Sequence, residues 1–213
     1  MVSQPIKDAG HIYIFNSPLC KANDLVKNCV EVLMNIYQPE VLKFIISDDV
    51  GSLSFFREPP HLLTDIICET AKIENALLWA VAEKEKRFKI FKEVSVENIE
   101  EYNKSKAFIH MPRILCVINN TTGDIANNET IVACIERLAT SGHIAGIHMI
   151  VCSPLGDKKY SKIVTSFPSK IIFKTFSTNQ ADLLGTDDAF DLQTPNDFLL
   201  IPAYGKVEKI SVK

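Results

Sequence analysis

The stretch HIYIFNSPLCKANDLV, residues 11–26, sets the fold question for this chain. Its opening residues are mostly apolar or β-branched and predict a buried strand, and its last residues begin an amphipathic helix. The segment between them, NSPLCKAN (16–23), must therefore turn the chain within a few residues. A strand, a tight loop and a helix in this order form the place where nucleotide-binding proteins hold phosphate, yet this loop contains no glycine.

Four further runs are short and apolar on both faces, like the first one. They are LKFIIS (42–47), RILCVIN (113–119), GIHMIVC (146–152) and KIIFKT (170–175). Hydrophobicity on both faces is typical of central strands in a parallel sheet that helices cover on each side. Because longer amphipathic stretches separate the strands, the sequence predicts a three-layer αβα fold of the α/β class with a mostly parallel central sheet.

Helices and a closing hairpin are expected between and after these strands. The predicted elements are a helix over 69–92, a short helix in SVENIEEYN (95–103) with Ser95 as its cap and Asn98 at the capping-box position, a helix over 128–142 ended by Gly142, a short helix and acidic loop over 177–192, and a hairpin made by DFLLIP (197–202) and KVEKISV (206–212). The charged face of the helix over 69–92 is interpreted as a solvated surface.

Length and composition favour one soluble domain over residues 1–213. The formal charge is −3 and the pI is near 6.0, so the overall charge gives no reason to expect a polyanionic partner. The six cysteines form no CxxC pair and the five histidines no ligand pattern, so we expect reduced thiols, no metal site and a cytoplasmic location. The longest apolar run, IAGIHMIVC (144–152), is too short to span a membrane.

Three segments resemble the motor core of the FtsK/SpoIIIE DNA translocases. The first, 59–103, contains Pro-His-Leu-Leu, an Asn-Ala-Leu-x-Trp helix, an acidic-basic run with an aromatic residue and a closing Tyr-Asn. The second is IERLATSGHIAGIHMIVCSP (135–154), and the third combines FPSKIIFKTFS (167–177) with NDFLLIP (196–202). The matching positions are Pro60, His61, Leu62, Leu63, Asn75, Ala76, Leu77, Trp79, Glu83, Glu85, Arg87, Tyr102, Asn103, Arg137, Leu138, Ala139, Ala145, Gly146, Ile147 and His148. Together the segments touch the chain from about Pro5 to Val207.

The resemblance implies a RecA-like P-loop fold, a hexameric ring around double-stranded DNA and ATP-driven translocation. It also places a phosphate loop after the first strand, and this chain departs from it there. The vestigial positions are Asn16, Ser17, Pro18, Leu19, Cys20, Lys21, Ala22 and Asn23. Asn16 and Lys21 stand at the glycine positions, Ala22 at that of the lysine and Asn23 at that of the magnesium-binding Ser or Thr.

Each replacement weakens a phosphate cradle for a physical reason. Pro18 contributes no N–H group to it. Leu19 occupies a position that is commonly glycine in the family, where a positive φ angle would strain a leucine. Ala22 supplies no positive charge, and Lys21 lies one residue early on a helix-start position. A shifted loop that brings Lys21 into use remains as an alternative.

The second half of the implied site is altered too. In the family an apolar strand ends in an acidic pair that holds hydrated magnesium and acts on the attacking water. Here RILCVINNTTGD presents Asn119 and Asn120 at those positions, and an amide neither brings charge to a metal nor takes a proton near neutral pH. Asp48 is kept after the second strand, whereas Ala181 and Asp182 lie near the place of the expected trans-acting arginine.

We therefore expect a non-catalytic FtsK/SpoIIIE-like domain that needs no cofactor and acts in assembly with partner proteins, in a homo-oligomer such as a ring, or in DNA-associated complexes. One alternative is an active translocase that uses ATP and magnesium on double-stranded DNA. Another is a degenerate secretion-type FtsK-like module. The basic clusters KEKRFK (84–89) and DKKYSK (157–162) are interpreted as solvated surface rather than as phosphate contacts. Neither an amino-terminal membrane region nor a carboxy-terminal winged-helix module is expected in this chain.

Overall fold

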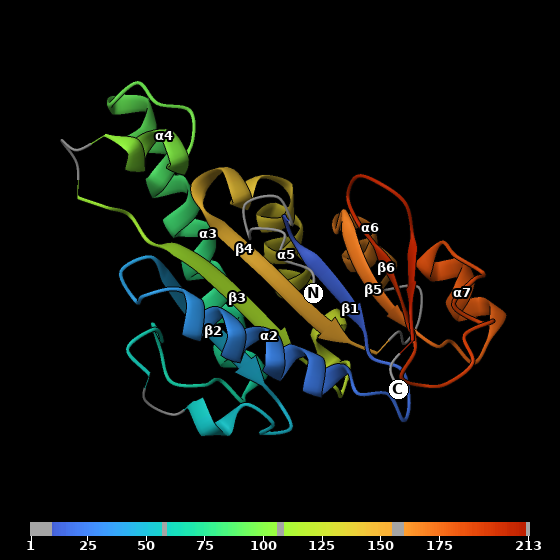
Figure 1. The fold of residues 1–213 in the computed structure, drawn as a ribbon. Helices are drawn as coiled ribbons and strands as arrows, with labels where there is room; N and C mark the ends of the chain where they lie inside the picture. The colour runs from blue at the N-terminus through green and yellow to red at the C-terminus, as the bar shows by residue number, and fades with distance from the viewer. Residues whose placement is uncertain (1–9, 57–58, 106–108, 155–159, 212–213) are drawn as a thin grey trace.

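The computed structural model describes residues 10–56, 59–105, 109–154 and 160–211, which fold around a single seven-stranded sheet (Figure 1). The strands are β1 (Ile12–Phe15), β2 (Leu42–Asp48), β3 (Arg113–Asn119), β4 (Ile147–Ser153), β5 (Ser169–Phe173), β6 (Phe198–Ile201) and β7 (Glu208–Ile210). Their order in the sheet is β2-β3-β4-β1-β5-β6-β7. The first five pair in parallel, and β6 and β7 form the antiparallel hairpin that the sequence predicts.

Helices cover both faces of this sheet, so the predicted αβα layers are confirmed (Figure 1). The helices are α2 (Ala22–Ile36), α3 (Thr70–Glu93), α4 (Ile99–Lys104), α5 (Glu129–Ser141), α6 (Tyr160–Ser166) and α7 (Thr178–Leu184), with 3-10 turns at Ser54–Phe56, Asp124–Asn127 and Gly142–Ala145. On one face α2 buries Val26 and Val30 against Ile14 and Phe44. On the other face α3, α5 and α6 share one apolar cluster. Burial on both faces explains why the middle of each parallel strand is apolar, with polar residues near the strand ends.

The helix predicted over 69–92 is α3, but its charged face is not simply solvated. Lys84 and Arg87 are buried, although both belong to the KEKRFK cluster. Arg87 donates through Nη1 to the carbonyls of Pro112 and Ala145, at 2.9 Å each, and through Nε to Glu83. The interpretation of this cluster as solvated surface is therefore wrong for these two residues. Arg87 joins α3 to the segments that enter β3 and β4, and Lys84 joins α3 to α5.

The predicted cap of α4 is wrong, whereas α5 ends at Ser141 with Gly142 as its C-cap, as predicted. Asn98, not Ser95, caps α4, since its side chain accepts a hydrogen bond from the backbone N–H of Glu101. Ser95 instead lies in the turn before it, with φ of 59°. At the end of α5 the chain does not reverse at Gly142, which keeps helical angles. The left-handed residue is Gly146, where an added Cβ would lie 2.2 Å from the Cδ1 atom of Ile99.

Helix α6 was not predicted, and it overlaps the second basic cluster. Residues 157–159 of DKKYSK lie outside the described residues, but Tyr160 begins α6 and is buried. Its hydroxyl donates to the carbonyl oxygen of Gly123. Tyr160 therefore belongs to the core rather than to a solvated surface.

Candidate functional site

The loop of residues 16–23 and the two asparagines at 119 and 120 meet at the carboxyl ends of neighbouring strands. The backbone N–H of Asn16, just after β1, donates to Ser153 O at the end of β4, at 2.9 Å. The N–H of Asn120, just after β3, donates to Cys152 O, also at 2.9 Å. The loops after β1 and β3 thus flank the end of β4, which is the edge where parallel α/β sheets hold ligands. The structure brings the sequence-predicted positions together at this edge.

One residue of the loop, Leu19, has a left-handed backbone conformation that normally favours glycine. Leu19 has a φ of 66° and a side chain that is 87% exposed. A leucine in this left-handed region crowds its own backbone, so the strain that a positive φ would bring to Leu19 is present in the structure. Lys21 is exposed and stands at the N-cap of α2 with no side-chain capping bond.

Side chains within the loop bond to protein groups instead of pointing into an open cradle. Ser17 is buried, and its hydroxyl donates to the carbonyl of Lys174 at 2.5 Å. The Cys20 thiol lies 3.5 Å from Asn16 Oδ1. Ala22 is fully buried in the first turn of α2. The charged and hydroxyl groups that a phosphate would need are thus absent from positions 22 and 23, and Ser17 is already engaged.

Asn119 forms the first of two contacts between amide and carboxylate groups. Its Nδ2 donates to Asp48 Oδ1 at 2.9 Å, and both side chains are completely buried. Asp48 also accepts from the Ser52 hydroxyl at 3.1 Å and from the Leu53 N–H at 2.6 Å. The carboxylate at the end of β2 is thus stabilised by three donors, one of which an aspartate at position 119 could not provide.

Asn120 forms the second contact, with Asp49. Its Nδ2 lies 3.2 Å from Asp49 Oδ2 and 2.7 Å from Asp124 Oδ1. Asp49 also accepts from the backbone N–H and hydroxyl groups of both Thr121 and Thr122, at 2.8 to 3.0 Å. Hydrogen bonds from Thr70 above all lower the pKa of Asp124 below its usual value. The negative charge at this edge therefore sits on the aspartates after β2 and in the turn after β3.

The residues present do not fit a magnesium–nucleotide group. Both carboxylates of Asp48 and Asp49 are engaged by N–H and O–H donors, which compete with a cation for the same oxygens. No group of three or more His, Cys, Asp and Glu side chains in the described parts of the chain is arranged to hold a metal. Asn119 and Asn120 do leave their Oδ1 atoms buried and without a hydrogen-bond partner among the described residues.

Sequence reasoning singled out Asp48 but missed Asp49, Thr121, Thr122 and Asp124. A signal was present, because the strands that carry SDD (47–49) and NNTT (119–122) are both apolar and end together. In the structure β2 and β3 are neighbours, and their register places Asp48 opposite Asn119. If β2 and β3 had been predicted as neighbours, the contact between Asp48 and Asn119 at their ends could have been predicted as well.

A parallel sheet of this order, with a tight loop after β1 and a polar pair after β3, defines the RecA-like class of P-loop ATPase folds. The pCW3 conjugation coupling protein TcpA, solved with ATPγS, has this fold, with a TM-score of 0.78 and 20% identity over 92% of this chain and 58% of its own. The cytoplasmic domain of the type VII secretion ATPase EccC of Thermomonospora curvata gives a TM-score of 0.79 and 17% identity, over 95% of this chain and 25% of its own.

Residues 25–117 match the FtsK/SpoIIIE family, so the resemblance to this family is confirmed. The DNA translocase FtsK of Clostridium tetani is 33% identical over 177 residues, which cover 78% of this chain and 24% of that protein. The Corynebacterium glutamicum protein of the same name is 26% identical over 228 residues, 98% of this chain and 25% of its own. The chain thus spans about a quarter of the length of these relatives. The family match begins after the vestigial loop and ends before Asn119.

Within the described residues, no helix is long and apolar enough to cross a bilayer.

Proposed function

We propose that this chain is a non-hydrolysing FtsK/SpoIIIE-type domain that serves as an assembly subunit in complexes with partner proteins. The observation that carries the proposal is the pairing of Asn119 with Asp48 and of Asn120 with Asp49. At the positions of the family's acidic pair, this chain has amide groups that donate to carboxylates. These amides cannot take a proton from water, and the carboxylates they bind are engaged.

The expected loss of rate is large because several parts are missing together. Removal of a single preorganised charge-stabilising group typically costs about 10²–10³ in rate. This chain has no lysine at position 22, no hydroxyl at position 23 and no acid at 119 or 120. Such losses are not additive, but each acts on the same phosphate and magnesium group. We accordingly expect neither ATP nor magnesium to be a cofactor.

The assembly role follows from what the chain keeps. A sheet with the family's strand order and its fastening contacts still presents surfaces on which other subunits can pack, even when the nucleotide site is closed. A homo-oligomer, including a ring, and a mixed complex with active motor subunits both fit this role. Binding to double-stranded DNA has weaker support, because Lys84 and Arg87 of the main basic cluster are buried in the protein.

An active translocase is the second candidate, favoured by one observation. Leu19 holds the left-handed turn that a phosphate loop needs, and Lys21 beside it is exposed. A loop that rearranged around a nucleotide could bring Lys21 to the phosphates. A secretion-type module is a third candidate, supported by the fold likeness to EccC.

Thermal melting with and without magnesium–ATP separates these functions. A ligand at 100 times its dissociation constant adds about 2.7 kcal/mol to stability, which corresponds to roughly 5–11 °C for a chain of this size. We expect no shift at millimolar ATP. A shift of several degrees that disappears in Lys21→Ala would overturn the proposal and establish the rearranged loop. Lys27→Ala, on the same helix and away from the loop, is the matched control.

A further inference from the structure

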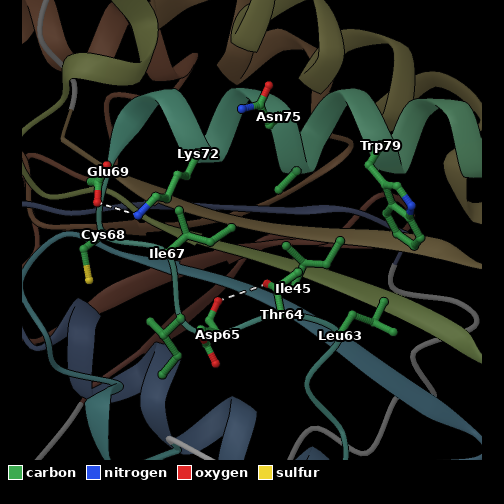
Figure 2. Close-up of a pocket in the computed structure, with 12 residues that line it drawn as sticks. Ile45, Leu63, Thr64, Asp65, Ile67, Cys68, Glu69, Lys72, Asn75 and Trp79 are labelled. Carbon is green, nitrogen blue, oxygen red and sulfur yellow. Dashed lines mark hydrogen bonds and ion pairs between the residues drawn. The ribbon is translucent and has the colours of Figure 1, made fainter.

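A cavity of about 730 Å³ opens between the amino-terminal half of α3 and the segment 63–68 beside β2 (Figure 2). Two isolated bridges join this part of the chain to the edge strand β2: Leu62, just before the segment, pairs with Phe44, and Ile67 pairs with Ser47. The cavity is lined mainly by apolar side chains, including Ile45 and Ile67. Trp79 reaches down from α3 toward Leu63, and their side chains stay 46% and 39% exposed. A half-exposed tryptophan over an open apolar cavity is typical of a binding surface.

The polar lining of this cavity carries one acid without a counter-charge. Glu69 and Lys72 pair with each other at 2.6 Å at one end of the cavity. Asp65, on the segment 63–68, has no ion pair with the described residues. The cavity therefore suits an apolar or aromatic side chain that is followed closely by a basic group.

The β6–β7 hairpin at the opposite end of the sheet presents such a pair. Tyr204 lies in its turn and is 91% exposed, and Lys206, two residues later, is exposed as well. Gly205 between them has φ of 116°, a conformation that restricts this position to glycine. An exposed tyrosine on a tight turn loses little conformational entropy when it inserts into a partner, which is why tyrosine is enriched among interface anchors.

The cavity and the hairpin cannot meet within one molecule. Six strand-to-strand steps separate β2 from β7 in the sheet order, and at about 4.8 Å each they span roughly 29 Å. Contact between them therefore requires two copies, arranged head to tail. Such a heterologous interface forms a closed ring or an open filament, depending on the rotation between copies.

We propose that Tyr204 of one copy inserts into the Trp79 cavity of a second copy, with Lys206 facing Asp65. This inference rests on the proposed assembly role, and it names the partner as the chain itself. The hairpin supplies the aromatic anchor and the positive charge, and the cavity supplies the apolar surface and the unpaired acid. Because both features lie on every copy, the contact can repeat from one copy to the next.

Disulfide trapping tests this contact directly, because Cys68 lines the cavity and is exposed. A Tyr204→Cys variant is oxidised with diamide, and its cross-linked products are mapped by mass spectrometry. A disulfide requires Cα atoms within about 7 Å, so we expect a 204–68 bond between copies and a ladder of covalent oligomers. Ile109→Cys, equally exposed at 90%, should give no bond to Cys68, and Cys68→Ser added to Tyr204→Cys should abolish the ladder. Absence of the 204–68 bond, or an equal yield from Ile109→Cys, would overturn the proposal.

Sedimentation of the unmodified chain gives an independent readout. Trp79→Ala and Tyr204→Ala should each weaken self-association at least tenfold, as expected of interface anchors. Lys206→Glu should weaken it less, and adding Asp65→Lys to the same chain should restore it. A chain that stays monomeric at 100 µM, or one whose association ignores all these changes, would refute the contact and leave the cavity to a different protein. An ATP-induced melting shift would refute the expectation that ATP is not a cofactor while leaving the trapped 204–68 bond in place, so the two proposals fail separately.

Discussion

The amino and carboxyl ends of the parallel strands, called here the amino edge and the carboxyl edge of the sheet, differ in the charged side chains that they hold. At the amino edge, Arg87 and Lys84 enter the protein from α3 and donate to backbone carbonyls: Arg87 to Pro112 and Ala145, and Lys84 to Arg137 at 3.2 Å. At the carboxyl edge, the positions where the family's chemistry resides hold amides and an alanine. The two buried cations therefore connect elements of the fold, while Ala22, Asn119 and Asn120 carry no charge.

The difference separates structural from chemical requirements within one domain. A buried guanidinium with two carbonyl partners and Glu83 can be lost only at the cost of orphaned groups, so the fold itself needs it. At the carboxyl edge, Asn119 satisfies Asp48 without any ligand. The site can therefore remain folded and closed when nothing binds there.

The largest effect is expected at the amino edge, from Arg87→Met. Burial lowers the pKa of Arg87, yet Glu83 and two carbonyls hold the charged form in place. Removal of one partner of a buried charge pair typically costs about 3–5 kcal/mol. We expect a loss of this size in the free energy of unfolding, measured by urea denaturation. Lys86→Met, a mostly exposed neighbour paired with the same glutamate, should change stability by less than about 0.5 kcal/mol. Equal effects of the two variants would contradict a structural role for Arg87.

Asn119→Asp is the corresponding test at the carboxyl edge. It places a second carboxylate at the 2.9 Å contact with Asp48, where both side chains are fully buried. Like charges this close cannot both ionise, so one proton must be taken up, and we expect a loss of about 2–4 kcal/mol at pH 7. The loss should shrink as pH falls, since protonation of one carboxyl restores a donor.

A double variant tests whether the contact between residues 48 and 119 causes this loss of stability. Asp48→Asn combined with Asn119→Asp exchanges the two groups and should recover most of the lost stability. If the double variant is no more stable than the single one, the contact between positions 48 and 119 does not explain the cost.

A third effect, at the amino edge, is a dependence of the free energy of unfolding on pH. His11 lies at the amino edge beside His143 and His148, with ring centroids 5.8 and 6.1 Å away. Burial above all, and then its histidine neighbours, lower the pKa of His11 to about 3. Because the unfolded chain takes up this proton near pH 6.5, stability is complete above that pH and falls as the pH decreases toward 3.

The measurement compares the parent with His11→Phe. Between pH 7 and pH 5 the parent should lose about 1–2 kcal/mol more than the variant, since the phenylalanine cannot bind the proton. His110→Phe, at an exposed position, is the control and should follow the parent. A parent and a His11→Phe variant with the same pH profile would show that His11 does not titrate in this way.

The sequence predicted the sheet more fully than the site, for a physical reason. Strands buried on both faces leave a continuous apolar signal, so all five parallel strands were located within two residues. The helix over 69–92 was also found, but periodicity could not tell that Lys84 and Arg87 point into the protein. Their partners are backbone carbonyls far away in the chain, which no pattern in α3 reveals.

At the site, the sequence shows which residue types are present, but not which side chains contact one another in the fold. A glycine-free loop and Asn119 were visible as single replacements, whereas the positive φ of Leu19 was found only in the structure. The Asp48–Asn119 contact depends on β2 and β3 being neighbours, 71 residues apart in the chain. Helix α6 has only seven residues, too few to establish a helical period, and the sequence shows Lys159 before it rather than a capping residue type such as Asn98 before α4 or Ser177 before α7.

The smallest predicted effect comes from Leu19→Gly, which changes the backbone preference of the loop but none of its charged or polar groups. Leu19 has a φ of 66°, and a left-handed conformation costs a non-glycine residue about 1–2 kcal/mol, part of which the greater freedom of glycine in the unfolded chain cancels. We expect a gain of about 0.5–1 kcal/mol in urea denaturation, whereas Val41→Gly, outside any left-handed turn, should lower stability. Leu19→Gly should still give no melting shift with magnesium–ATP, because Ala22 and Asn119 are unchanged. If glycine alone restored ATP binding, strain at residue 19 rather than the missing charges would be what keeps the site closed.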